Sequence, residues 1–133
     1  MFISANKLAE FSDYANHYTL NKIRQKMSFS EEGKRILDQQ PRVNSIQIKK
    51  LLSLPENTFG YKYAAFMDKF DLKPEERPLV RYMDDYELAY IKQRYTEIHD
   101  FIHVILGYND ISILSELKVK QFESIHFGFA VSL

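Results

Sequence analysis

The chain has 133 residues, 45% of them hydrophobic and 27% charged, which is enough for one soluble domain, residues 1–133, with one hydrophobic core. Eighteen basic side chains balance eighteen acidic ones, so no overall charge draws the protein to nucleic acid. With no cysteine, disulfides, thiol nucleophiles and iron–sulfur clusters are excluded, and any metal must be held by His, Asp or Glu. No apolar run approaches the roughly 18 residues needed to span a bilayer.

Helical patterns separated by turn signals follow one another along the chain and predict a compact, all-α, multi-helix domain. The first helix is expected from about Lys7 to Met27, and Ser28 or Ser30, followed by acidic residues, begins a second that Pro41 ends. The further expected elements are a short helix at Ser45–Leu52, a helix at Phe59–Phe70 capped at Asn57-Thr58, and a turn at Lys73–Pro78. Asp84-Asp-Tyr-Glu87 then has the spacing of a capping box and begins a long helix that Gly107 ends.

Charge is unevenly distributed along the sequence. Leu20 to Lys50 holds eight basic and three acidic residues, whereas the chain from Leu51 onward holds nine basic and thirteen acidic. Two interpretations stay open for the basic stretch: a solvated helical surface, or a contact with anionic lipid head groups.

The long helix carries both an apolar stripe and a polar edge. The stripe is expected to be buried and consists of Leu88, Ile91, Tyr95, Ile98, Ile102 and Ile105. Beside it, His99 and His103 lie about 40° apart and Asp100 about 100° from His99, at about 100° per residue. After Gly107-Tyr-Asn-Asp110, which supplies a helix stop and a new cap, an antiparallel helix is expected to bury Ile111, Leu114, Leu117, Phe122 and Ile125. This helical hairpin brings Glu116 opposite the two histidines.

His99, Asp100, His103 and Glu116 therefore form a candidate metal site. Imidazole and carboxylate ligands suit Zn²⁺ and also accommodate Fe, Co or Mn. The alternative is that the histidines are polar residues at the edge of the core and that the carboxylates pair with Lys92, Arg94 or Lys120.

A larger set of residues resembles the coenzyme Q (ubiquinone) biosynthesis protein COQ-four family, in unbroken register over roughly residues 22–128. The segments are Arg42-Val-Asn-Ser45, Ser53-Leu-Pro-Glu-Asn-Thr-Phe-Gly60, Phe66-Met-Asp68, Glu76-Arg-Pro78, Val80-Arg81, Asp84-Asp85, Glu87-Leu-Ala-Tyr90, Gln93-Arg-Tyr95, Glu97-Ile-His-Asp100 with His103, Gly107, Glu116-Leu117, Lys120 and Phe122-Glu123. In that family the HDxxH-x12-E motif, here His99, Asp100, His103 and Glu116, is a metal site usually described as zinc. The resemblance also implies an all-helical fold.

The family is credited with two roles: organising the coenzyme Q biosynthetic complex, and removing the C1 carboxyl group of a polyprenylated 4-hydroxybenzoate. The resemblance thus implies a lipid substrate, and it implies other coenzyme Q biosynthesis proteins and a second copy of the chain as partners. In eukaryotes it implies a peripheral membrane protein on the matrix side of the mitochondrial inner membrane. In a bacterium the implied place is the cytoplasmic membrane surface. Family members usually have further helices at both ends, so we expect a fragment, a partial gene or a shortened member. Ser115 also stands where a glycine is usual, which removes no ligand.

Further side chains receive roles under this interpretation. Lys120 and Glu123 are expected to support the ligating carboxylate. Arg81 and Arg94 are candidates to bind an anionic substrate or, equally, to form exposed ion pairs with acids, which are Asp84, Asp85 or Glu97. Aromatic side chains are available for a polyprenyl channel, although an ordinary aromatic core explains most of them better; they are Phe59, Tyr63, Phe66, Phe70, Tyr95, Phe101, Phe122 and Phe127.

Two other functions compete with the metal-dependent decarboxylase. The first is a non-catalytic, lipid-binding scaffold in which the metal is structural. The second, from spacing alone, is a phosphohydrolase of the HD type. That class needs a separate upstream His and a downstream Asp, for which only His17 and the too-close Asp110 are available, so it ranks last.

Overall fold

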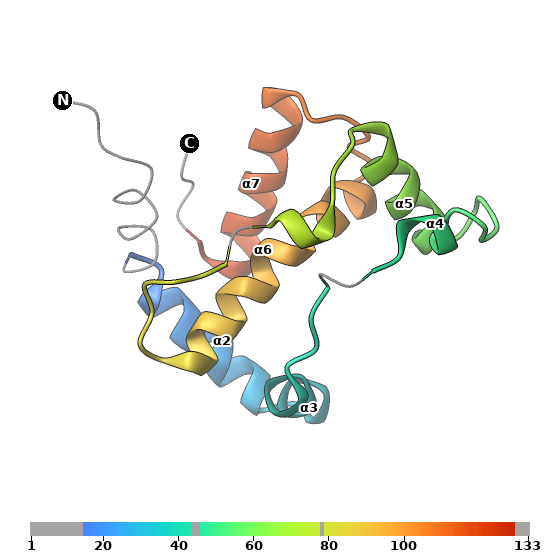
Figure 1. Cartoon of the computed structure of the whole chain (residues 1–133). Coiled ribbons are helices and arrows are strands. Elements are labelled where there is room, and N and C mark those ends of the chain that lie inside the picture. Colours follow the sequence, from blue (N-terminus) through green and yellow to red (C-terminus); the bar gives the residue numbers. More distant parts are fainter. Residues whose placement is uncertain (1–14, 44–45, 78, 130–133) are drawn as a thin grey trace.

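The computed structural model describes residues 15–43, 46–77 and 79–129, and this part of the chain is all-α, as predicted (Figure 1). The expected beginning of the first helix at Lys7 and the positions of Ser45 and Pro78 lie outside these residues. The described elements are α2 (His17–Ser28), α3 (Glu31–Gln39), α4 (Ile48–Leu51), α5 (Phe59–Lys69), the 3-10 turn η1 (Pro74–Glu76), α6 (Tyr86–Leu106) and α7 (Ile113–Phe127). Within them, no helix combines the length and the apolar character that crossing a membrane requires.

The helix ends follow local capping chemistry. The side chains of Ser30 and Thr58 accept hydrogen bonds from the backbone N–H three residues ahead. Asp85 accepts from Glu87 and Leu88 and begins α6, one residue later than the Asp84–Glu87 capping box that the spacing predicts. Gly107 ends α6 with a left-handed φ of 76° that a side chain would disfavour. The predicted cap at Asp110 is wrong by two residues, because Ser112 caps α7 and Asp110 instead accepts from the Ser112 N–H.

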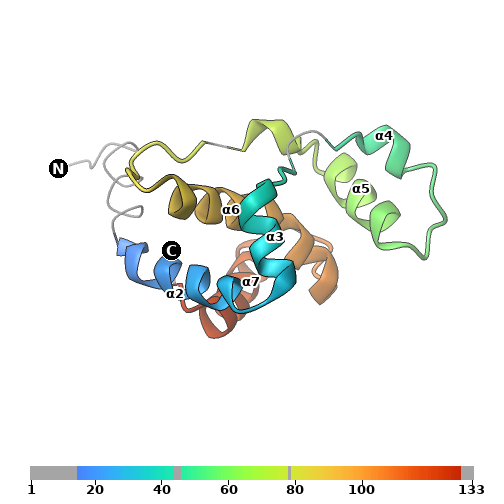
Figure 2. The same ribbon diagram turned by 90° about the horizontal axis from the view of Figure 1, so that it is seen from below.

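Helix α6 is the centre of the fold. Helices α2, α5 and α7 all pack on it, α3 packs on α2, and α4 packs on α5, so that the two pairs lie toward opposite ends of α6 (Figure 2). One hydrophobic cluster joins α2 to the first half of α6 through Leu20, Leu88 and Ile91, and a second surrounds Tyr63, Phe66 and Met67 of α5. The second half of α6, which carries the histidines, contacts the second cluster through Phe101 and Val104.

The predicted apolar stripe of α6 is buried at three of its six positions, half-buried at Tyr95 and Ile98, and exposed at its end. Leu88, Ile91 and Ile102 are buried, whereas Ile105 is 67% exposed. At that last turn Phe101 and Val104, rather than Ile105, face the cluster around α5.

The predicted buried face of α7 is wrong. Ile111, Leu114, Leu117 and Ile125 are all exposed, and the buried residues of the helix are Ser115, Val119 and Glu123. The reason lies in the contacts of Glu116, Lys120 and Glu123, which turn their side of α7 toward α6.

Candidate metal centre

Two histidines of α6 and a glutamate of α7 come together where the helices face each other. Both imidazole Nε2 atoms point at the Glu116 carboxylate: that of His99 lies 3.2 Å from Oε2, and that of His103 lies 3.1 Å from Oε1. One ligand atom from each of the three residues lies within 4.8 Å of the others, a spacing that can hold a metal ion. The structure therefore assembles three of the four side chains that the sequence singles out.

His103 has the environment of a ligand rather than of a core histidine. Its side chain is 1% exposed, and its ring stacks on Phe66 with centroids 5.4 Å apart. Although Nε2 is near Glu116, the approach is not aligned for a hydrogen bond, and neither ring nitrogen has a hydrogen-bond partner among the described residues. Because a buried polar atom without a partner is costly, a cation bound at Nε2 would satisfy it. The donor set thus fits a divalent metal.

His99 is held in place from behind by Glu123. The Nδ1 of His99 lies 2.6 Å from Oε1 of Glu123, which is fully buried on α7. With Nδ1 donating to this carboxylate, the Nε2 lone pair is free to face Glu116 and a metal, an arrangement common around metal-bound histidines. Glu123 therefore orients a predicted ligand, although that ligand is His99 and not, as expected, Glu116.

A small polar network completes the support of Glu123. Its Oε2 accepts a hydrogen bond from the Tyr95 hydroxyl and pairs with Lys120 Nζ at 3.1 Å. Burial opposes the charge, but hydrogen bonds from His99 and Tyr95 and the Lys120 ammonium lower the pKa of Glu123 below its usual value. Burial and the Glu123 carboxylate in turn raise the pKa of Tyr95. The predicted supporting role of Lys120 thus takes the form of a contact with Glu123, not with Glu116.

Asp100 does not join the group. Its carboxylate is 5% exposed and is paired with Arg77, which directly follows η1. As a metal ligand, Asp100 stays a prediction. The sequence patterns do not identify Arg77 as a residue of the site, although it lies in the Glu76-Arg-Pro78 segment of the family resemblance.

Among the described residues, no hydrogen bond or ion pair joins either arginine proposed as an anion binder to the three donors. Arg81 is exposed on the loop before α6, and Arg94 donates to the Pro41 carbonyl at 3.4 Å. Two of the three acids expected to pair with them have other partners: Asp85 is paired with Arg24 at 2.8 Å, and Glu97 is paired with Arg42. Two cations of the basic stretch Leu20–Lys50 are therefore used inside the fold.

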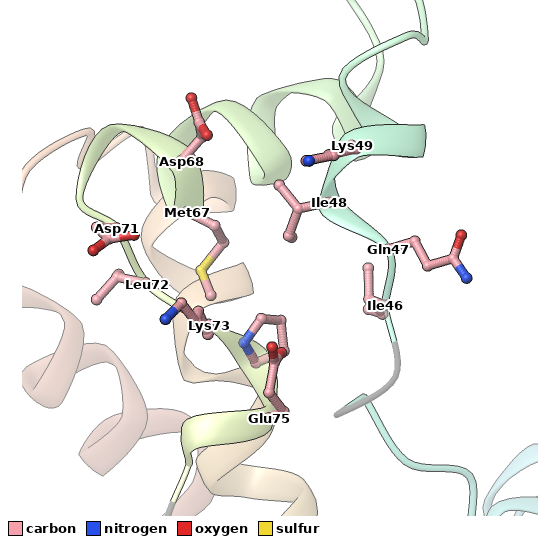
Figure 3. Close-up of a pocket in the computed structure, with 11 residues that line it drawn as sticks. Ile46, Gln47, Ile48, Lys49, Met67, Asp68, Asp71, Leu72, Lys73 and Glu75 are labelled. Atoms are coloured by element: carbon pink, nitrogen blue, oxygen red, sulfur yellow. The ribbon is translucent and has the colours of Figure 1, made fainter.

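Two of the pockets in the described part of the chain are relevant to a substrate. An apolar cavity of about 230 Å³ is lined by Ile23, Met27, Ile91, Arg94, Tyr95, Ile98, Phe127 and Phe129. A larger pocket, of about 520 Å³, lies between residues 46–49 and the region of α5 and η1, where Met67, Ile46 and Ile48 point toward one another under a charged rim (Figure 3). Of these two, only the apolar cavity is lined by a residue connected to the metal group, namely Tyr95, which donates to Glu123 behind His99. Of the other aromatic residues proposed for a channel, Tyr63 and Phe66 are buried in the core around α5.

Comparison with known proteins identifies the family. The model of the family described as "Coenzyme Q (ubiquinone) biosynthesis protein Coq4" matches residues 3–133. A ubiquinone biosynthesis protein COQ4 homolog 2, mitochondrial, of Paramecium tetraurelia is 46% identical over 129 residues, which cover 96% of this chain and 61% of that protein. A COQ4 homolog of Homo sapiens is 38% identical over 128 residues, covering 95% and 48%, and one of Aedes aegypti is 43% identical over 111 residues, covering 82% and 40%.

The chain thus spans between 40% and 61% of the length of these three relatives. The family match runs through the helices that carry His99, His103 and Glu116. The chain belongs to the coenzyme Q (ubiquinone) biosynthesis protein Coq4 family.

Proposed function

We propose that this chain acts in ubiquinone biosynthesis, as a metal-dependent decarboxylase that removes the C1 carboxyl group of a polyprenylated 4-hydroxybenzoate. The observation that carries the proposal is the donor group of His99, His103 and Glu116, in which the buried nitrogens of His103 have no hydrogen-bond partner among the described residues. Membership of the Coq4 family supports the pathway.

The three donors would hold a divalent ion, and Zn²⁺ is the metal we propose, with Fe, Co or Mn compatible with the same ligands. Such an ion supplies Lewis acidity toward a carboxylate or phenolate oxygen. Loss of CO₂ leaves an electron pair on the ring carbon, which takes up a proton. The chain's own residues position the ligands, because Glu123 fixes the orientation of the His99 ring. The Glu116 side chain is 42% exposed, so one side of the donor group is accessible to a substrate.

The apolar cavity supports a substrate with a hydrocarbon tail. Its wall is almost entirely aliphatic and aromatic, and Arg94 supplies one positive charge there. Tyr95 lines this cavity and also donates to Glu123, so it connects the cavity to the support of His99. We propose that the tail lies in this cavity, with Arg94 rather than Arg81 near the anionic end.

The setting of the reaction is also a proposal. A polyprenyl substrate requires contact with a bilayer, and the relatives' names place them in mitochondria, which supports a peripheral position on the matrix side of the inner membrane. Lysines such as Lys22, Lys26, Lys49 and Lys50, which lie in the basic stretch, are exposed and suit anionic head groups. Other coenzyme Q biosynthesis proteins and a second copy of the chain are the proposed protein partners.

The test compares His103→Ala with His126→Ala. His126 is an exposed histidine of α7 whose ring stacks on Phe122, so its loss controls for removal of an imidazole. We expect purified wild type and His126→Ala to contain metal and to decarboxylate a short-tail polyprenyl-hydroxybenzoate, and His103→Ala to lose both properties. Full turnover without metal would refute the proposal. Metal binding and capture of partner enzymes without turnover would instead support the scaffold.

A further inference from the structure

The corner between α6 and α7 exposes a group of apolar side chains. Thirteen large hydrophobic residues are exposed in the described part of the chain, and five of them fall within residues 105–117. They come from the last turn of α6, the loop and the first turns of α7, and we call them the apolar corner: Ile105, Ile111, Ile113, Leu114 and Leu117. The loop of this corner lies at the edge of the fold (Figure 1). An exposed apolar group of this kind marks an interaction site.

Three lysines border the apolar corner. The Lys69 ammonium donates at 3.1 Å to a carbonyl oxygen of the loop between α6 and α7, and Lys118 Nζ lies 5.1 Å from the ring centroid of Tyr108 in the same loop. Lys62 lines a pocket of about 300 Å³ where α5 meets this loop. The acidic side chain of the loop is Asp110. The corner therefore combines exposed apolar groups with a net positive border.

We propose that the apolar corner is the membrane contact of this chain and enters the head-group layer of an anionic bilayer. In such a contact the apolar side chains reach the acyl boundary, the lysines meet lipid phosphates, and a tyrosine lies at the level of the head groups. Ile113 is 81% exposed, so it projects from α7 and can enter lipid without a change of fold. Interfaces between proteins are, in contrast, depleted in lysine.

Two other regions offer only part of this combination. Three exposed apolar residues fall within residues 79–87, but that segment holds three acidic side chains and one basic one, which an anionic surface repels. The basic stretch Leu20–Lys50 has the opposite deficit, because Phe29 is its one exposed large hydrophobic residue in the described part of the chain. Of the three regions, the apolar corner alone has several apolar side chains together with a positive border.

The apolar corner also lies beside the accessible side of the donor group. Glu116 stands in the first turn of α7, between Leu114 and Leu117 in sequence, and its side chain is 42% exposed. A bilayer that meets the first turns of α7 therefore lies next to the group that would hold the metal. Delivery of a polyprenyl substrate at this point rests on the proposed function, whereas the contact with the bilayer does not.

The experiment measures co-sedimentation of the full chain with vesicles of phosphatidylcholine mixed with phosphatidylglycerol. Ile113→Gln is compared with Ile125→Gln, because both isoleucines are exposed on α7, at 81% and 72%, but lie about 18 Å apart along the helix. We expect Ile113→Gln to weaken binding roughly three- to tenfold and Ile125→Gln to stay within about twofold of the wild type. Lys118→Gln should weaken binding about fivefold, and the wild type should bind phosphatidylcholine alone more weakly. Circular dichroism checks that each variant is folded.

Several outcomes would overturn the proposal. A wild type that does not bind the mixed vesicles is one, and equal binding by the wild type and Ile113→Gln, or equal losses in Ile113→Gln and Ile125→Gln, is another. A loss in Lys49→Gln/Lys50→Gln but not in Ile113→Gln would place the contact on the basic stretch instead. Sedimentation equilibrium without vesicles tests for a protein contact: a wild-type dimer that Ile113→Gln dissociates, without vesicle binding, would assign the corner to a second copy. A wild type that binds vesicles as expected but does not decarboxylate a short-tail substrate in detergent would refute the proposed function and leave this inference standing.

Discussion

Glu123→Gln tests whether the metal centre depends on the buried carboxylate behind His99. The substitution keeps the shape of the side chain and removes its charge. In the native protein both carboxylate oxygens are used: Oε1 lies 2.6 Å from His99 Nδ1, and Oε2 contacts Tyr95 and Lys120. A glutamine has one acceptor oxygen and one donor group, so it cannot serve all three neighbours.

Either orientation of the amide is unfavourable. If its oxygen faces His99, its NH₂ group meets the Lys120 ammonium, another donor. If its NH₂ group faces His99, Nδ1 must accept, which places the imidazole proton on Nε2, the atom that points at Glu116. The second orientation blocks the ligand atom itself.

The expected loss follows from these contacts. Removing an outer partner of a metal-bound histidine lowers metal affinity roughly 10- to 100-fold, or about 1.4 to 2.7 kcal/mol. Folding is affected as well, because hydrogen bonds to a charged group contribute about 1.5 to 3 kcal/mol each and the glutamine retains part of the set. We expect the free energy of unfolding to fall by about 2 to 3 kcal/mol.

The assay is metal affinity, measured by competition with a chromophoric chelator, beside urea unfolding followed by circular dichroism. Glu97→Gln is the matched control, because Glu97 is also buried and ion-paired but contacts Arg42 and not the histidines. It should lose stability and keep its metal affinity. The reasoning is refuted if Glu123→Gln binds metal as the wild type does, or if Glu97→Gln weakens binding to the same extent.

Three further predictions concern the scaffold around α6. Arg42→Ala leaves the buried Glu97 without its ion pair and, because Arg42 is itself a third exposed, should lower the free energy of unfolding in urea by about 2 to 4 kcal/mol. Burial opposes the charge of Glu97, but Arg42 and the Val43 N–H lower the pKa of Glu97 below 4.5. Ionised Glu97 therefore adds its full contribution to the free energy of unfolding at neutral pH, and this contribution is lost as the pH falls through the lowered pKa. Urea titrations from pH 7 to pH 3 should show this loss, and a flatter profile in Arg42→Ala; parallel profiles would contradict the assignment. Gly33→Ala would place a Cβ 2.1 Å from the Met27 carbonyl oxygen and should lower the thermal midpoint, at a cost of about 1 to 3 kcal/mol. Gly60→Ala meets the flexible side-chain ends of Leu54 and Leu51 and should have a smaller effect, so equal effects would refute the close approach at Gly33.

The elements that the sequence predicts well are those set by neighbouring residues. Ser30, Thr58 and Asp85 cap helices because each side chain reaches backbone N–H groups two or three residues away. Gly107 ends α6 because its own φ is positive. His99 and His103 share an edge because they are four residues apart on one helix. None of these features needs knowledge of the tertiary fold.

Partners distant in sequence could not be predicted in this way. Asp100 pairs with Arg77, 23 residues away across a loop, and not with the metal group that its spacing on α6 suggested. Glu97 likewise pairs with Arg42, 55 residues away, although Arg94 is only one turn distant. Which basic side chain pairs with a buried carboxylate depends on the tertiary fold. Here the conformation of the connecting segments places Arg77 beside Asp100 and Arg42 beside Glu97.

The face that α7 turns toward α6 is set by the contacts of the candidate site and not by the apolar periodicity of the helix. Glu116 and Glu123 are seven residues apart and share one face of the helix, with Val119 and Lys120 beside them. Leu114 and Ile125 lie about 160° to 180° from Glu116, so α7 cannot present its carboxylates to α6 and bury these apolar side chains in the same interface. Val119 is the one fully buried apolar residue in the described part of α7, and Phe127 packs at the edge of the core. The polar contacts of Glu123 with His99 and Tyr95 therefore contribute much of what holds α7 on α6, and a metal bound at Glu116 would strengthen that attachment.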